Sequence, residues 1–368
     1  QGLGSVSNLS DQFPWGLWIG FDLLCGVGLA SGGFVVTAAV YIFDLKRFKP
    51  IARPAILTAF LGYLLVVLAL MFDLGRPWNI WHPLVMWNPS SVMFEVAWCV
   101  TLYSTVLALE FSSMIFEKIG WVRAAAIQHK ISFPLVVVGV VLSTLHQSSL
   151  GTLYLIVPGK LHALWYTPLL PVLFLVSSII VGLAMVIVES RLSSRAFGRQ
   201  LEMPLLMTIG HILAGLLVML TGLRFFDLWN RGELATLFAF DYESKLALLE
   251  LVPFMILPTF LLATPRLRAN PSWLYGSAVL VVLGFVVNRL NVSITGMEAA
   301  SGGHYVPSWA EAGITMFIIV LGFGVFAWAA KHLPVFPTEK EEDDLLFEAL
   351  EPLSPAHGTR EEAPLAKA

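Results

Sequence analysis

The sequence FPLVVVGVVL (133–142) is followed directly by STLHQSS (143–149). The first run is almost purely hydrocarbon, and together with its flanks it is long enough to cross a membrane as a helix. The second run places an imidazole, an amide and several hydroxyls at the end of that helix. Polar groups at such a position need a partner, a cavity or a function.

The composition of the whole chain agrees with a membrane location. Of its 368 residues, 57% are hydrophobic and 13% are charged, with 12 Trp and 25 Phe, which is too apolar for a soluble domain of this length. The formal net charge of -3 gives no reason to expect a nucleic-acid partner. Cys25 and Cys99 both lie in apolar runs, so we expect neither a disulfide framework nor an iron-sulfur cluster.

Apolar segments of membrane-crossing length recur along the chain. About 20 apolar residues span a bilayer core of about 30 Å, and this criterion predicts an all-α integral membrane protein with nine transmembrane helices. They are expected near 15–43, 51–73, 91–116, 131–150, 167–188, 204–226, 244–263, 272–290 and 309–331.

The basic residues indicate an orientation. Lys and Arg gather after the first, third, fifth and seventh spans and in the tail, whereas the other loops are rich in Trp, Tyr, Pro and Gly. Because basic loops stay on the cytoplasmic side, the C-terminus is expected there and residues 1–14 outside. An external start favours one more span before Gln1. The acidic segment 334–368 is predicted to be a mobile cytoplasmic tail.

Ionisable residues inside the first four spans are predicted to meet near the outer surface. Asp22 lies near the outer end of the first span, Asp73 and Arg76 close the second, Glu95 begins the third and His146 ends the fourth. Helical spacing places Asp22, Gly26, Leu29 and Gly33 on one stripe, and Gly139, Ser143 and His146 on another. Small residues beneath each polar group favour a pocket for a bulky flat molecule. The alternative is structural: an ion pair of Asp73 with Arg76, and Glu95 as a partner for an outer aromatic residue.

A second polar group is expected at the outer ends of the later spans. It contains Arg224, Asp227, Glu250, Arg289 and Glu311. The spacing leaves open whether these residues form a pocket or a salt-bridge network that docks a partner.

Histidines in membranes raise the question of haem. A b-type haem needs two axial ligands at matching depth, but only His146 and His211 fall within spans, at opposite depths. We therefore predict no haem and no metal in this chain.

Several motifs together resemble the NrfD/polysulfide-reductase (PsrC-like) membrane-subunit family, in particular its HybB-type hydrogenase-2 branch. The motifs are Gly2–Ser7, Phe13–Asp22, Arg53–Ala55, Asp73–Arg76, Ser91–Glu95 and His146–Ser149. The similarity runs along nearly the whole chain, is weaker in the fifth to eighth spans and the tail, and departs from the HybB type in the loop 74–90.

The resemblance implies a haem-free quinone-binding subunit of a multi-subunit oxidoreductase in the bacterial inner membrane. Two four-helix bundles with a flanking helix are implied, which divides the chain into 1–14, 15–150 with the quinone site, the loop 151–166, 167–290, 309–331 and the tail. A periplasmic ferredoxin-like iron-sulfur subunit and the large and small subunits of a [NiFe] hydrogenase are the implied partners. Electrons would pass to menaquinone or ubiquinone.

Quinone reduction takes two protons, which suggests roles for the polar groups. His146 ordinarily titrates near neutrality and would serve one carbonyl, and Asp22 would serve the other or relay protons to His146. Glu95, His146, Gln147, Arg76, Asp73 and Asp22 form the predicted quinone site, and Glu95, Tyr103 and Glu110 a candidate proton path. The alternatives are a cytochrome c-linked or sulfur-linked member of the family, a proton or solute transporter, and a passive membrane anchor.

Overall fold

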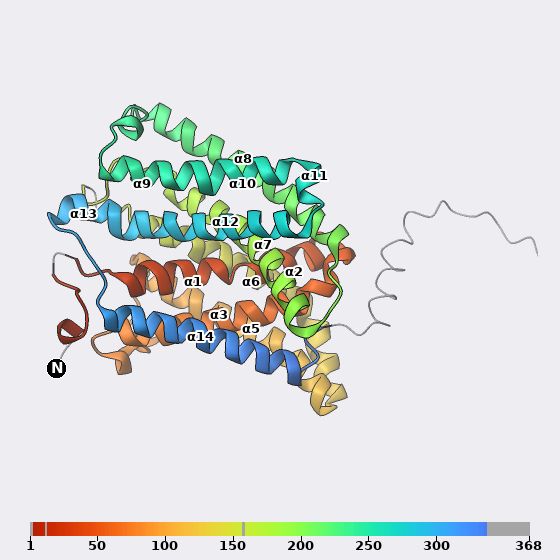
Figure 1. The fold of residues 1–368 in the computed structure, drawn as a ribbon. Helices are drawn as coiled ribbons and strands as arrows, with labels where there is room; N and C mark the ends of the chain where they lie inside the picture. Colours follow the sequence, from red (N-terminus) through yellow and green to blue (C-terminus); the bar gives the residue numbers. More distant parts are fainter. Residues whose placement is uncertain (1–2, 12, 157–158, 337–368) are drawn as a thin grey trace, which may run out of the picture.

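The protein is a bundle of long helices. In the computed structural model, residues 3–11, 13–156 and 159–336 are described, and within them nine helical segments are long and apolar enough to cross a membrane. They are Trp18–Ile42, Lys46–Asp73, Val92–Ile119, Val122–Leu153, Leu170–Phe197, Met203–Asn230, Tyr242–Ala263, Pro271–Glu298 and Trp309–His332. The helices run along one common direction, and the described part contains no strand (Figure 1). The predicted all-α membrane architecture is confirmed.

The first four spans form one bundle. The first span is built from η2 (Trp18–Leu23), α1 (Leu24–Leu29), α2 (Gly32–Thr37) and η3 (Ala38–Ile42). The other three are α3 (Lys49–Asp73), α5 (Val92–Ile119) and α6 (Val122–Leu153). Helix α3 packs against α2 and α5, and α5 packs along α6.

The next four spans form a second bundle beside the first. They are α7 (Leu170–Phe197), α8 (Met203–Asn230), the composite α9 (Tyr242–Leu251), η7 (Val252–Ile256) and α10 (Leu257–Ala263), and the composite α12 (Pro271–Leu290), η8 (Asn291–Thr295) and α13 (Gly296–Ser301). The first span joins the bundles because α1 contacts α7 and α12. The remaining short helices are η1 (Leu3–Ser5), η4 (Lys46–Phe48), η5 (Pro77–Asn79), α4 (His82–Val85), η6 (Thr236–Phe238) and α11 (Pro265–Arg268).

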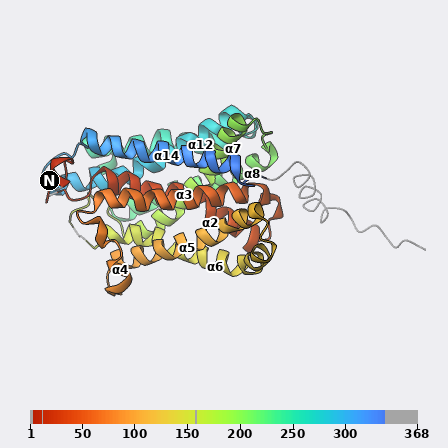
Figure 2. The ribbon, with the colours of Figure 1, turned by 90° about the horizontal axis from the view of Figure 1, so that it is seen from below.

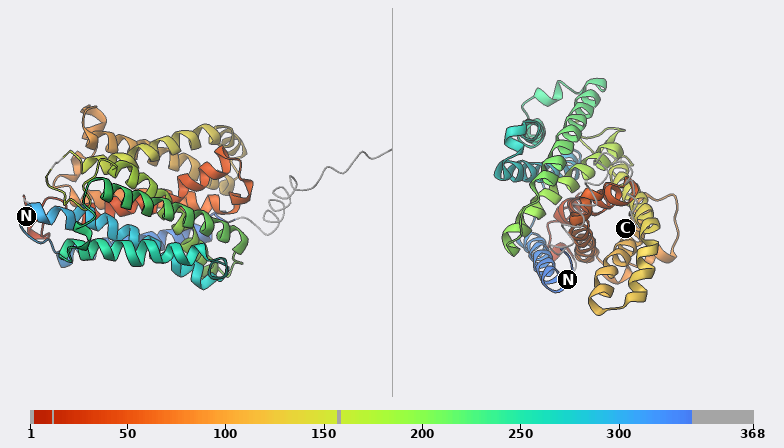
Figure 3. Two further views of the ribbon diagram at one scale, coloured as in Figure 1. Left: turned by 90° about the horizontal axis from the view of Figure 1, so that it is seen from above. Right: turned by 90° about the vertical axis from the view of Figure 1, so that its right-hand side faces the viewer.

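The last span, α14 (Trp309–His332), flanks the first bundle. It packs against α3 and η2, and the end-on view shows it at the edge of the molecule beside the first span (Figure 3). The view from below shows α14 and α3 side by side, with α4 projecting from one end of the bundle (Figure 2).

The two ends of the molecule differ in chemistry. One end, here called the basic end, carries the segments 43–49, 120–121, 198–202 and 264–270 with their neighbouring Lys and Arg. The opposite end, here called the aromatic end, carries the segments 3–17, 74–91, 154–169, 231–241 and 302–308. Trp78, Trp81 and Trp87 are exposed there.

Two element boundaries in the structure differ from the predicted ones. Helix α7 runs to Phe197, beyond the expected end at 188, because a helix can continue past the apolar core until Gly198 turns the chain in a left-handed conformation (φ 68°). The predicted mobile tail begins too early, because Val335 is fully buried and Phe336 packs near Phe197. The rest of that prediction falls on residues outside the described part.

The first span is irregular at two points that matter for the site. Its beginning, η2, is a π-helix, a rare form that is frequent at functional sites. Its middle is interrupted at Ala30 and Ser31, where the Ser31 hydroxyl donates a hydrogen bond to the Ser178 carbonyl of α7 at 2.5 Å. The first span is thereby fixed between the two bundles.

Candidate functional site

A large apolar cavity lies between the first span and helices α3, α7 and α14. Its volume is about 530 Å³, within the usual range for ligand pockets. Apolar side chains make up most of its wall, including Phe21, Leu61, Met185, Ile318 and Phe323, and its ionisable residues are Asp22 and Glu189.

Asp22 is held at one end of this cavity. It lies in η2 and is only 6% exposed. Thr315 of α14 donates a hydrogen bond from its hydroxyl to Oδ2 of Asp22 at 2.7 Å. Asp73 at the end of α3 is close enough to interact electrostatically with Asp22, and its own Oδ1 has no partner among the described residues. Two of the predicted carboxyls, Asp22 and Asp73, therefore lie toward the aromatic end.

The cavity continues from Asp22 toward the basic end. The first span and α3 run in opposite directions, since Gly26 lies against Val66 and Gly33 lies against Ala59. Thr58, the neighbour of Ala59, is therefore at the height of Phe34. Phe34 follows Asp22 by twelve residues, which corresponds to about 18 Å at a helical rise of about 1.5 Å per residue. There Thr58 donates a hydrogen bond to Oε2 of Glu189 in α7 at 2.7 Å. The apolar cavity thus has one polar pair near its aromatic end and a second along its wall, since its lining continues past Glu189 on α7 as far as Phe197.

His146 lies elsewhere, inside the first bundle. It belongs to a buried group that we call the tyrosine-histidine cluster: Tyr63 of α3, Tyr103 of α5, and Ser143 and His146 of α6. Nδ1 of His146 is 2.9 Å from the Leu142 carbonyl, which can only accept, so this nitrogen carries the proton. Nε2 then accepts from the Tyr63 hydroxyl in a short hydrogen bond. Both ring nitrogens are occupied, and none of the residues in the cluster lines the cavity.

The two predicted stripes have different surroundings. Asp22, Gly26 and Leu29 do line one cavity, as their spacing predicted, whereas Gly33 packs against Ala59. The stripe of Gly139 with Ser143 and His146 faces the ring of Tyr103, and a Cβ at Gly139 would lie 3.4 Å from that ring. The expectation of an open pocket beneath His146 was therefore wrong, because an aromatic side chain from α5 fills the space.

The remaining predicted site residues do not reach the cavity. Gln147 donates to the Val27 carbonyl at 3.0 Å and links α6 to the first span. Glu95 is exposed and accepts from the Ser149 hydroxyl at 2.8 Å. Arg76 is exposed and forms no ion pair with Asp73 within the described ranges. Glu110 is buried on α5, nearer the basic end.

The second predicted polar group consists mainly of buried ion pairs. Arg224 contacts Glu250 at 3.1 Å, and Arg231 contacts Asp227 at 2.8 Å. Arg289 instead lies 3.6 Å from the centre of the Phe174 ring and donates to Ser177. A small cavity of about 40 Å³ borders Arg224 and Glu250.

Glu311 does not belong with this group. It caps α14 and accepts from the backbone nitrogens of Asn8 and Ser308 at 3.0 and 2.8 Å. The Tyr305 hydroxyl donates to it in a short hydrogen bond. Burial, and then this carboxylate, raises the pKa of the Tyr305 phenol, so the phenol remains a donor. Glu311 therefore fixes the N-terminal segment against the start of α14.

A b-type haem with two axial histidines does not fit His146 and His211, the two histidines within the described spans. An axial histidine must offer one ring nitrogen to iron, and both nitrogens of His146 already form hydrogen bonds. His211, the other histidine within the spans, is exposed on α8. We therefore derive no step through a haem.

Several polar residues of these sites were not predicted. Thr315 and Tyr63 carry single hydroxyls in otherwise apolar runs, which is common in membrane helices and gives no distinctive signal. The sequence does single out Glu189, because placing a carboxylate inside a membrane span costs free energy. Its hydrogen bond with Thr58, however, depends on packing between α3 and α7.

Comparison with known proteins places this helical membrane protein in a family. Residues 5–299 match the family described as polysulphide reductase, NrfD. The chain belongs to this family, which confirms the predicted resemblance.

Three relatives cover nearly the whole chain. A protein of Nitratidesulfovibrio vulgaris whose name states no function is 41% identical over 91% of this chain and 88% of its own length. The probable Ni/Fe-hydrogenase 2 b-type cytochrome subunit of Escherichia coli is 35% identical over 95% and 90%. The integral membrane subunit of menaquinone reductase from N. vulgaris is 30% identical over 93% and 87%. The name of the E. coli relative disagrees with the prediction of a haem-free subunit, whereas in this chain both ring nitrogens of His146 already form hydrogen bonds.

Proposed function

We propose that this chain is the quinone-reactive membrane subunit of a respiratory oxidoreductase complex, with its quinone bound in the cavity that Asp22 lines. The observation that carries the proposal is the single carboxyl that Thr315 holds at 2.7 Å at one end of an apolar cavity of about 530 Å³. The named relatives, a hydrogenase subunit and a menaquinone reductase subunit, support the same class of reaction.

The shape of the cavity suits a quinone. A quinone has a flat head with two carbonyl oxygens and an apolar isoprenoid tail. The head would lie against Asp22 and Thr315, and the tail would follow the apolar wall toward α7. The cavity is not fully enclosed, so a lipid-soluble substrate would enter it from the bilayer.

The residues at the head position can support proton-coupled reduction. Asp22 can hold one proton and deliver it to a carbonyl oxygen as that oxygen gains electron density. Thr315 fixes the rotamer of Asp22 through its hydrogen bond. Asp73, whose Oδ1 has no partner among the described residues, would exchange protons with Asp22.

A separate route for protons through the first bundle is supported by unpaired hydroxyls. The Tyr103 and Ser143 hydroxyls have no partner among the described side chains, and Tyr103 lies on α5 between Glu95 and Glu110. Ordered water commonly fills such sites. We include Glu95, Tyr103 and Glu110 as a path along the cluster that contains His146.

The charge distribution supports an orientation, and the named relatives support the class of partner. The basic end would face the cytoplasm of a bacterium and the aromatic end the periplasm. Electrons would then arrive at the aromatic end from a ferredoxin-like iron-sulfur subunit that serves [NiFe] hydrogenase subunits. They would pass to menaquinone or ubiquinone beside Asp22.

The experiment that tests the proposal is quinone binding by purified protein. Asp22→Ala removes the hydrogen-bond donor at the head position and is expected to weaken binding of a menaquinone analogue roughly tenfold, the equivalent of one hydrogen bond. Asp241→Ala is the matched control, because Asp241 caps α9 outside the cavity. Binding that is equally strong in Asp22→Ala would contradict the head position, and a native chain that binds no quinone would favour a passive anchor.

A further inference from the structure

The apolar cavity has a second carboxyl in its wall, that of Glu189. Glu189 lies on α7, where Thr58 donates to its Oε2 at 2.7 Å. Its other oxygen, Oε1, is buried and has no hydrogen-bond partner in the described part of the chain. A purely structural carboxyl in a membrane would have both oxygens satisfied, because an unpaired buried polar atom costs about 1–3 kcal/mol.

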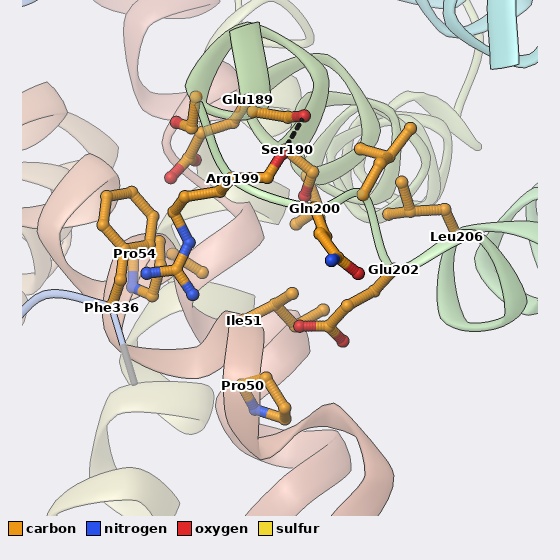
Figure 4. A pocket seen from close by; sticks show the side chains of 15 residues that line it. Pro50, Ile51, Pro54, Glu189, Ser190, Arg199, Gln200, Glu202, Leu206 and Phe336 are labelled. Atoms are coloured by element: carbon orange, nitrogen blue, oxygen red, sulfur yellow. Dashed lines mark hydrogen bonds between the residues drawn. The ribbon is translucent and has the colours of Figure 1, made fainter. Parts of the chain in front are cut away.

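A second, smaller pocket approaches Glu189 from the basic end. It has a volume of about 60 Å³ and lies between the start of α3, the end of α7 and the segment 198–202 (Figure 4). Its lining is mixed and includes the polar side chains of Arg199, Gln200 and Glu202, and Gln200 is exposed, so water can reach it.

Glu189 stands between the two spaces. It lines the small polar pocket and also the large apolar cavity. Ser193, one turn further along α7, is the other residue that borders both, and it is not ionisable. A carboxyl at such a boundary can be loaded from water on one side and face the cavity on the other.

We propose that Glu189 is the group through which protons pass between the pocket at the basic end and the cavity. A proton from water in the pocket binds Oε1, and the Glu189 carboxyl then releases one proton to an acceptor in the cavity, with Thr58 exchanging its hydrogen bond. The carboxyl gains one proton from the pocket and loses one to the acceptor, and the step involves no electron transfer. The identity of the acceptor rests on the proposed quinone, whereas the reactivity of Glu189 does not.

Carbodiimide labelling tests this inference without any electron donor. Dicyclohexylcarbodiimide is apolar and modifies protonated carboxyls, so it should label Glu189 of the full chain in liposomes through the cavity. A water-soluble carbodiimide should label Glu189 when it is added at the basic end, and should label it at least about tenfold less from the aromatic end. Peptide mass spectrometry locates each label.

Two variants give the controls. Glu189→Gln should lose this label and keep the others, whereas Glu202→Gln should keep the label, because Glu202 lines the pocket but not the cavity. Absence of label at Glu189 from both reagents, or labelling only from the aromatic end, would overturn the inference.

Proton uptake during turnover, measured together with quinone binding, distinguishes the role of Glu189 from the proposed function. In the intact complex in liposomes, Glu189→Gln should slow proton uptake at the basic end at least about tenfold, as expected for loss of a proton-transfer group, while quinone still binds. Unchanged uptake with normal quinone binding would refute the role of Glu189 alone. Failure of the native chain to bind quinone would refute the proposed function and leave the labelling result standing.

Discussion

Asp22 and His146 differ in what their side chains can still bind. Asp22 receives one hydrogen bond, from Thr315, and its carboxyl borders an apolar cavity. His146 is fully buried and uses both ring nitrogens within the protein. A group with spare hydrogen-bonding capacity beside a cavity can meet a substrate, whereas a saturated group can act only after it gives up a partner.

The two tyrosines beside His146 give a matched test of this difference. Tyr63→Phe should lower the free energy of unfolding by about 1–3 kcal/mol, because it leaves Nε2 of His146 buried without a partner. Tyr103→Phe should cost less, because the Tyr103 hydroxyl forms no hydrogen bond of ordinary geometry among the described residues and loses only its proximity to Ser143. Thermal unfolding of the purified variants in one detergent measures both, and an equal loss would contradict the assigned hydrogen bond.

The buried ion pair of the second bundle gives a second prediction at the residue scale. Glu250→Gln should destabilise the protein by about 3–5 kcal/mol, because Arg224 is left as an uncompensated buried charge. Glu243→Gln, at a half-buried position at the start of α9 where the described residues offer no ion pair, should change stability by less than about 1 kcal/mol. If the two variants had the same denaturation midpoint, the ion pair of Arg224 with Glu250 would be solvated rather than buried.

At the scale of elements, glycines decide how closely the first span approaches its neighbours. A Cβ added at Gly182 of α7 would lie 2.8 Å from the Gly32 nitrogen and 2.6 Å from the Ser31 hydroxyl. Real Cβ atoms do not approach backbone so closely, so the first span and α7 can pack here only while both positions stay small.

Gly182→Ala should therefore loosen the contact between the bundles. We expect it to lower the midpoint of thermal unfolding and to weaken quinone binding, since both helices line the cavity. Gly215→Ala on α8 is the control, because nothing lies within 4 Å of its added Cβ, and it should be neutral or stabilise by up to about 1 kcal/mol. If the two variants changed quinone binding and the unfolding midpoint equally, the contact between the first span and α7 would not be tight.

The nine spans could be predicted from the sequence because hydropathy over 20 residues is a local property. Helix ends were less predictable, since α7 continues to Gly198 on polar residues that no hydropathy window counts. The partners of side chains depend on packing between distant segments: Tyr63 and His146 are separated by 83 positions, and Thr315 and Asp22 by 293. The carboxyls near the aromatic end were therefore foreseeable, whereas the ring that closes the space beneath His146 was not.

At the scale of the whole molecule, the cavity connects polar groups near the two ends of an apolar bundle. Asp22 and Thr315 lie toward the aromatic end, and Glu189 and Thr58 toward the basic end, about 18 Å apart along the helices. A redox complex that receives electrons at one surface and protons at the other could use both ends. Substrate bound near the aromatic end would then be reduced with protons taken from the basic end.

The central claim, that quinone lies beside Asp22, is tested most directly by photolabelling with an azidoquinone followed by peptide mass spectrometry. The account predicts label in the segments 18–29 and 309–323, and competition by unlabelled menaquinone. Label concentrated in α5 and α6 around Tyr103 and His146, with none beside Asp22, would contradict it.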